Sequence, residues 1–346
     1  MAQGSILAAA RAADGAPSGA VAERLAKLAE RAPKAEAAPG GAPDLTAALA
    51  AFVAQHARGA VDEGRVRELV AEAIEAARIT PRDVRVHVAE REPVTVEGPV
   101  HPAFDAACKR LACALPVLLV GPAGTGKTHL ARQLAQALGL DWHGAVSFTA
   151  GTSEGALLGR LLPTGEGGRM EYAGTPFVRA FEEGGLVCLD EVDAADPNTL
   201  GCLNAALANG ELWIPARVDK PRAVRHERFA VVACANTWGN GGSREYVGRN
   251  QLDAATLDRF RMGRVLVDYD RSFEARLVGE GDLLARWWEL RSKARELALR
   301  VVVSTRGLLD AHRLMGAGLT LAEVVEILAM DWTPDMRTRL GVGGAS

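Results

Sequence analysis

The chain has 346 residues, of which 48% are hydrophobic and 24% charged, a globular composition that excludes a wholly disordered protein. Its formal net charge is −3, so no overall field attracts nucleic acid or anionic lipid, and any such contact must be local. The five cysteines form no CxxC pair, which disfavours a disulfide framework or a zinc ribbon. No stretch approaches the roughly 18 apolar residues of a membrane span. We expect about two domains in a soluble, cytoplasmic protein with reduced thiols.

The first quarter of the chain differs in composition from the rest. Residues 1–44 hold 16 Ala, 5 Gly and 4 Pro and no aromatic residue, which predicts a low-complexity, mostly disordered arm. Apolar residues at helical spacing over 45–56 and 66–77 predict two amphipathic helices. Alternating valines over 84–88 predict a strand or hairpin. We therefore expect residues 45–97 to form a helical accessory region, either a partner-docking face or a layer packed on the main domain.

Short apolar runs alternate with helical patterns from residue 98 to 270. The runs cover 117–120, 186–189, 229–235 and 265–267. Apolar runs of this length, separated by helices, are typical of strands buried on both faces of a parallel sheet. The sequence thus predicts an α/β domain over 98–270 with its parallel sheet flanked by helices.

Beyond Asp270 the strand signal stops. Helical patterns follow over 273–279, 282–299, 305–315 and 321–330. We expect an all-helical lid domain over 271–334 and a flexible tail, rich in Gly and Ser at its end, over 335–346.

One glycine-rich segment follows the first predicted strand and matches GxxxxGK[ST] in full. Its residues are Gly121, Pro122, Ala123, Gly124, Thr125, Gly126, Lys127 and Thr128. Glycines let backbone N–H groups curl around phosphate oxygens, and the following helix adds its positive N-terminus. Lys127 would reach the β- and γ-phosphates, and the Thr128 hydroxyl would ligate Mg²⁺. The segment predicts a P-loop with a nucleotide and Mg²⁺ as cofactors.

Two carboxylates end the second apolar run. Asp190 and Glu191 follow Leu186–Leu189, so their charge lies at the carboxyl edge of the sheet, where ligands of α/β proteins bind. Asp190 would hold Mg²⁺, and Glu191 would orient and deprotonate the attacking water. Asp193 is interpreted as a supporting residue or a helix cap.

The third run, Phe229–Ala235, ends in the amide of Asn236. Asn is also a good turn residue, so this position has a purely structural interpretation as well. The expected order of the strands favours a functional interpretation of Asn236, in which its amide lies between the two preceding strand ends and fixes the attacking water.

These motifs, together with Leu257-Asp258-Arg259-Phe260, resemble the AAA+ ATPases. The pattern is similar to their MoxR and dynein-related branch, which includes CobS-type cobalt-chelatase subunits and phage-encoded relatives. The resemblance covers about residues 98–330. Residues 155–174 resemble the helix-2 insert hairpin of that branch, and residues 210–228 resemble its hairpin before the Asn strand.

The resemblance implies roles for two arginines. Arg259 would be an arginine finger that enters the nucleotide site of a neighbouring subunit, where a guanidinium offsets charge on the transferring phosphoryl group. Arg249, Arg261 and Arg264 lie nearby and compete for that assignment. Arg306 would contact the γ-phosphate from its own subunit as sensor 2.

The family likeness implies Mg²⁺-dependent ATP hydrolysis by a homo-oligomeric ring, a hexamer, that remodels a partner protein. A von Willebrand factor A-type metal-binding protein is the implied partner, and metal insertion is one implied use. GTP is disfavoured because the guanine-reading Asn-Lys-x-Asp motif is absent. Two alternatives stay open: a nucleic-acid motor that binds through the basic cluster 217–228, and a nucleotide-gated scaffold with little turnover.

Overall fold

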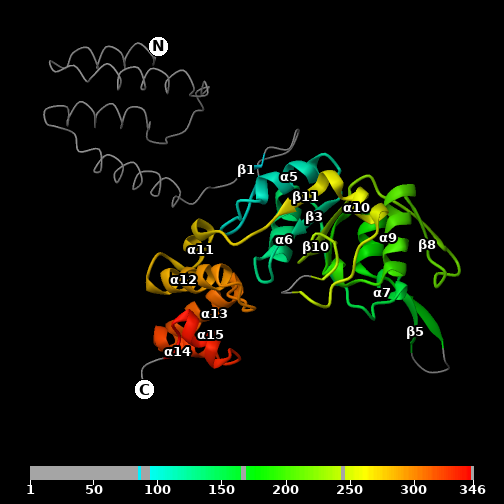
Figure 1. Ribbon diagram of the computed structural model, residues 1–346. Helices are drawn as coiled ribbons and strands as arrows, with labels where there is room; N and C mark the ends of the chain where they lie inside the picture. The colour runs from blue at the N-terminus through cyan, green and yellow to red at the C-terminus, as the bar shows by residue number, and fades with distance from the viewer. Residues whose placement is uncertain (1–84, 87–93, 165–168, 243–245, 344–346) are drawn as a thin grey trace, which may run out of the picture. The chain divides into compact units, whose positions relative to one another are not determined.

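A computed structural model describes residues 85–86, 94–164, 169–242 and 246–343 (Figure 1). The arm predicted over 1–44 and the two helices predicted before residue 84 lie outside the described residues. Within them, β1 (Arg85–Val86) pairs antiparallel with β2 (Val94–Thr95) just before the α/β domain.

The α/β domain is built on a five-stranded sheet in the order β11-β3-β10-β7-β4. These strands are β11 (Arg264–Leu266), β3 (Val117–Val120), β10 (Phe229–Ala235), β7 (Gly185–Asp190) and β4 (Trp142–Ser147). Every neighbouring pair is parallel. The predicted parallel sheet is confirmed, and β10 lies between β3 and β7, as the interpretation of Asn236 requires.

The sequence pattern does not predict the strand β4. It pairs with β7 alone, at the edge of the sheet, and only Val146 among its residues is buried. An edge strand with half-exposed faces carries no continuous apolar run, so the pattern that reveals the central strands does not appear here.

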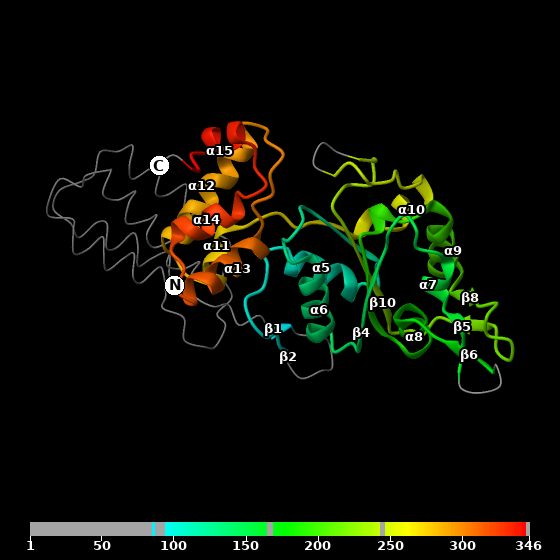
Figure 2. The same cartoon turned by 90° about the horizontal axis from the view of Figure 1, so that it is seen from below.

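Helices cover both faces of the sheet, and the two views agree on this arrangement (Figure 2). On one face, α5 (Phe104–Ala112) and α6 (Lys127–Ala137) pack against one set of strand side chains. On the other, α7 (Glu154–Leu158), α8 (Pro176–Glu183) and α9 (Pro197–Asn209) pack against the alternate set. Because successive strand residues face opposite sides, the central strands are buried throughout.

Two hairpins extend from this domain where the sequence predicts inserts. The first pairs β5 (Arg160–Pro163) with β6 (Met170–Ala173), and the second pairs β8 (Glu211–Trp213) with β9 (Arg222–Val224). A short helix, α10 (Ala254–Arg259), follows the loop after β10.

The residues after 270 form helices around a core of their own, which contains the fully buried Trp287. These helices are α11 (Arg271–Val278), α12 (Asp282–Glu296), α13 (Thr305–Gly316), α14 (Leu321–Leu328) and α15 (Pro334–Leu340). Together with the sheet, they form the predicted architecture, a parallel α/β domain followed by an all-helical C-terminal region. Across the described residues, no helix is both long and apolar enough to cross a membrane.

The flexible tail predicted over 335–346 is wrong for most of its length. The helix α15 begins with Pro334 after the cap Thr333, whose hydroxyl accepts a hydrogen bond from the Met336 N–H. Leu340 and Val342 are buried in the helical core. Within this short capped helix only Leu340 is buried, which is too little to show a helical period in the sequence.

Candidate nucleotide site

The glycine-rich segment forms a tight loop between β3 and α6. Gly124 and Gly126 adopt φ values of 74° and 88°, the left-handed region that favours glycine. A Cβ on Gly124 would lie 2.6 Å from the Cβ of Ser304, so only glycine fits there. A Cβ on Gly126 would meet nothing within 4 Å, which leaves open space at the N-terminus of α6. This shape suits a loop that wraps around phosphate.

Lys127 lies inside this loop, with only 8% of its surface exposed. Its Nζ donates to the carbonyls of Gly121 (2.7 Å) and Pro122 (2.8 Å) and to Oδ1 of Asn236 (2.9 Å). Burial lowers the pKa of Lys127, whereas the nearby carboxylate of Asp190 acts to raise it. The sheet order therefore brings the predicted lysine and the predicted amide into contact.

Thr128 and Asp190 meet although 62 residues separate them. The Thr128 Oγ1 donates to Oδ2 of Asp190 at 2.7 Å. A hydroxyl and a carboxylate are the oxygen donors that Mg²⁺ prefers, and Mg²⁺ commonly takes its remaining ligands from phosphates and water. No cluster of three or more His, Cys, Asp or Glu side chains that could cage a metal occurs among the described residues. The pair thus fits a magnesium ion bound together with a nucleotide.

Glu191 follows at the end of β7 in an unusual conformation. Its φ is 57°, and its N–H donates to Oδ1 of Asp190 at 3.0 Å. A left-handed conformation is uncommon for a residue other than glycine, and such residues cluster at functional sites. Its side chain is 46% exposed, so the carboxylate is accessible to water.

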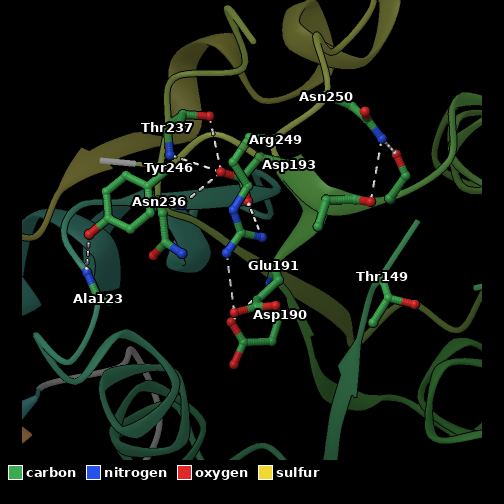
Figure 3. Close-up of polar contacts among 12 residues, drawn as sticks. Ala123, Thr149, Asp190, Glu191, Asp193, Asn236, Thr237, Tyr246, Arg249 and Asn250 are labelled. Atoms are coloured by element: carbon green, nitrogen blue, oxygen red, sulfur yellow. Dashed lines mark hydrogen bonds and ion pairs between the residues drawn. The ribbon is translucent and has the colours of Figure 1, made fainter. Parts of the chain in front are cut away.

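Asp193 is fully buried and organises the turn after β10 rather than capping a helix. Its Oδ2 accepts hydrogen bonds from the N–H groups of Asn236 (3.1 Å) and Thr237 (3.0 Å) and from the Thr237 hydroxyl (3.0 Å) (Figure 3). This carboxylate fixes the backbone that presents the Asn236 amide to Lys127.

The segment 246–250 reaches the site from the loop after β10. Tyr246 Oη accepts a hydrogen bond from the backbone N–H of Ala123 in the P-loop at 2.8 Å. Arg249 forms ion pairs with Glu191 and Asp193, each at 3.4 Å (Figure 3). Tyr246 is not predicted from the sequence, and Arg249 is predicted only as a rival arginine finger, because no sequence motif marks a contact made across a loop.

The start of α13, and Tyr269 just before α11, also contact the P-loop. The backbone N–H of Arg306, at the start of α13, donates to the Gly124 carbonyl at 3.2 Å. The Tyr269 hydroxyl donates to the Ala123 carbonyl at 2.8 Å. Arg306 therefore lies next to the loop through its backbone, and its side chain is exposed.

Arg259 is not part of this cluster. It ends α10, and its guanidinium donates to the carbonyls of Asn204 (3.1 Å) and Ala255 (2.8 Å). None of its hydrogen bonds to the described residues goes to the P-loop.

Several known proteins are similar to part of this chain. An uncharacterized protein of Staphylococcus epidermidis is 32% identical over 157 residues, which is 44% of this chain and 55% of that protein. Midasin of Dictyostelium discoideum is 35% identical over 147 residues, 42% of this chain but 2% of midasin. The chain thus spans about half the length of the staphylococcal relatives it matches.

Among solved structures, the RuvB Holliday junction branch migration motor of Thermotoga maritima has a TM-score of 0.40 at 17% identity. That match covers 66% of this chain and 65% of RuvB. NtrX of Brucella abortus has a TM-score of 0.38 at 15% identity, over 84% of this chain and 58% of NtrX. One family model covers both the P-loop and the strand ends of the site: residues 116–260 match the AAA domain, dynein-related subfamily.

Proposed function

We propose that this protein is a Mg²⁺-dependent ATPase that works as a ring and remodels a partner protein. One observation carries the proposal: the predicted residues at three separate strand ends form two hydrogen-bonded pairs, Lys127 with Asn236 and Thr128 with Asp190. The match of residues 116–260 to the AAA domain supports nucleotide-driven work in general.

Each side chain has a role that its chemistry allows. The N–H groups of the loop and Lys127 bind the phosphates, and Thr128 and Asp190 hold Mg²⁺, which offsets phosphate charge when bound. Glu191 accepts a proton from water as the water oxygen bonds to the γ-phosphorus and the bond to the ADP oxygen breaks. Asn236 orients that water.

Two arginines complete the proposed site, Arg306 from the same subunit and Arg259 from a neighbouring one. Arg306 lies at the P-loop by its backbone and has an exposed side chain that is available to the phosphates. Arg259 lies away from its own P-loop, and its half-buried side chain is available to a neighbouring subunit in a hexameric ring. A finger supplied in trans makes hydrolysis depend on assembly.

The basic hairpin favours a protein substrate over nucleic acid. Arg217 forms a bidentate ion pair with Glu182, and Arg222 forms an ion pair with Glu211. Arg225 and Arg228 donate to the carbonyls of Leu207 and Gly139. Arginines already engaged within the chain have fewer donors for phosphates. A MoxR- or CobS-like role with a von Willebrand factor A-type partner belongs to this proposal, and the sequence resemblance supports it.

The test is phosphate release by the full chain with ATP and Mg²⁺, compared with Glu191→Gln. We expect the variant to bind ATP but to turn over at least about 100-fold more slowly, because it lacks the general base. Equal, slow rates for both would support the nucleotide-gated scaffold and refute the ATPase. The same assay with single-stranded DNA at two salt concentrations tests the motor, which predicts a salt-sensitive stimulation. Pull-down with Glu191→Gln and ATP would capture the partner.

A further inference from the structure

Arg249 joins two carboxylates that have different environments. Its Nη2 lies 3.4 Å from Oε1 of Glu191, and its Nη1 lies 3.4 Å from Oδ1 of Asp193 (Figure 3). The arginine side chain is 14% exposed, Asp193 is fully buried, and Glu191 is 46% exposed. One guanidinium thus connects the buried carboxylate of Asp193 with the accessible carboxylate of Glu191.

The Asp193 end of this bridge is fixed. Three donors from Asn236 and Thr237 hold Oδ2 in place, while the buried Oδ1 has no hydrogen-bond partner among the described residues and faces the charge of Arg249. The backbone carbonyl of Asp193 also accepts from the N–H of Asn250 at 2.7 Å. The residue after Arg249 is therefore tied to the same aspartate, which keeps the arginine at this position.

The Glu191 end is loose. Both ion pairs of Arg249 measure 3.4 Å, longer than the roughly 2.8 Å of a strong charge-assisted hydrogen bond. Only the Glu191 partner is half-exposed, and half-exposed ion pairs are weak. Phosphate is also a good partner for the planar guanidinium, which can bind two of its oxygens at once. A triphosphate on the P-loop can therefore compete with Glu191 for the arginine.

The segment that carries Arg249 also contacts the loop where the phosphates would bind. Tyr246 lies three residues before Arg249, and its hydroxyl accepts a hydrogen bond from the backbone N–H of Ala123. One short stretch of chain thus contacts the P-loop, the proposed general base and its buried neighbour. A ligand that displaces the Tyr246 contact acts on the segment that positions Arg249.

We infer that Arg249 is a positioning residue that holds Glu191 toward Asp193 in the nucleotide-free chain and exchanges Glu191 for triphosphate when ATP binds. Asp193 keeps the arginine in place during the exchange, and the Glu191 carboxylate is released from its ion pair with Arg249. The inference rests on the proposed ATPase function and adds a step to it: binding of a triphosphate, but not of a diphosphate, releases the base.

A double-mutant cycle on nucleotide affinity tests the exchange. We would titrate the full chain with a non-hydrolysable ATP analogue and with ADP, both with Mg²⁺, using wild type, Arg249→Gln, Glu191→Gln and the double variant. When Arg249 is present, Glu191→Gln should raise the affinity for the analogue relative to that for ADP, because the freed guanidinium can then bind the phosphate. That gain should be at least about threefold smaller in the Arg249→Gln background.

Additive effects, with the same gain in both backgrounds, would overturn the inference even if every variant binds ATP. Wild type that binds neither nucleotide would refute the proposed function and the exchange with it. Arg271 provides the matched control, because its ion pair with Glu280 has a similar length of 3.3 Å and lies on the exposed surface of α11. Arg271→Gln should leave the gain from Glu191→Gln unchanged.

Should Arg249→Gln fail to fold, as judged by circular dichroism, Arg249→Lys takes its place in the cycle. Lysine keeps the charge beside Asp193 but lacks the fork that contacts two groups. We expect the gain from Glu191→Gln to fall in this background too, and an unchanged gain would overturn the inference.

Discussion

Replacement of Glu274 by Gln probes the buried ion pair that connects three helices of the C-terminal domain. The Glu274 side chain on α11 is fully buried and accepts four hydrogen bonds. Two come from the guanidinium of Arg291 on α12 at 2.8 and 2.9 Å, one from the Trp288 indole at 2.6 Å, and one from the Thr305 hydroxyl at 2.5 Å. Every oxygen lone pair that the carboxylate can offer is in use.

The expected cost follows from what the substitution leaves behind. Arg291 is only 4% exposed on its side chain, so Glu274→Gln leaves a guanidinium buried without a counter-charge. Breaking one partner of a buried pair costs about 3–5 kcal/mol. The Arg291 guanidinium also stacks on the ring of Tyr269, 3.9 Å from its centroid, and that contact survives. We therefore expect a loss near the lower limit, about 3 kcal/mol.

Urea unfolding followed by tryptophan fluorescence measures this loss, since Trp287, Trp288 and Trp332 all belong to the helical domain. Glu280→Gln is the control, because its ion pair is exposed and should be worth less than about 1 kcal/mol. A loss below about 1 kcal/mol for Glu274→Gln would refute the assignment of a buried charge pair.

A second substitution separates lost charge pairing from lost packing. In Glu274→Gln with Arg291→Met, the uncompensated charge is gone, and stability should recover in part. The pair also bears on the site, because Thr305 precedes Arg306, whose N–H contacts Gly124 of the P-loop. Glu274→Gln should therefore slow ATP turnover at urea concentrations that leave the domain folded.

Three further outcomes are expected. Lys127→Ala should weaken ATP binding at least about tenfold, measured by titration, and unchanged affinity would contradict its place at the phosphates. Arg259→Ala should lower turnover about 1,000-fold and regain part of it when mixed with Lys127→Ala subunits; no recovery at any ratio would contradict a finger in trans. A maleimide should label the exposed Cys113 well before the buried Cys188 and Cys234 in the native chain, and equal rates by mass spectrometry would contradict the pairing of β7 with β10.

The central strands of the fold could be predicted because burial on both faces leaves a continuous apolar run in the sequence. Val117–Val120 and Phe229–Ala235 are such runs, and both are strands with the predicted bounds. The edge strand Trp142–Ser147 was not predictable in this way, since its exposed positions remove the run. Burial, rather than strand propensity, carries the signal.

The residues of the site also differ in how well the sequence predicts their positions. Residues that follow a strand directly, such as Asp190 and Asn236, are placed by the sheet, so the strand order is enough to bring them to Thr128 and Lys127. Arg249 follows β10 by a loop of more than ten residues, and nothing local in the sequence fixes where such a loop returns.

Asp193 shows why the loop returns to this place. Its position two residues after Glu191 is visible in the sequence, but its burial depends on the left-handed turn at Glu191, which directs the chain inward. Once buried, the carboxylate requires partners, because an unpaired charge inside a protein is costly. The turn after β10 satisfies Oδ2, and Arg249 is the cation that faces Oδ1. Because the buried carboxylate of Asp193 requires a compensating cation, Arg249 lies next to the proposed general base. This position is what allows Arg249 to act on Glu191.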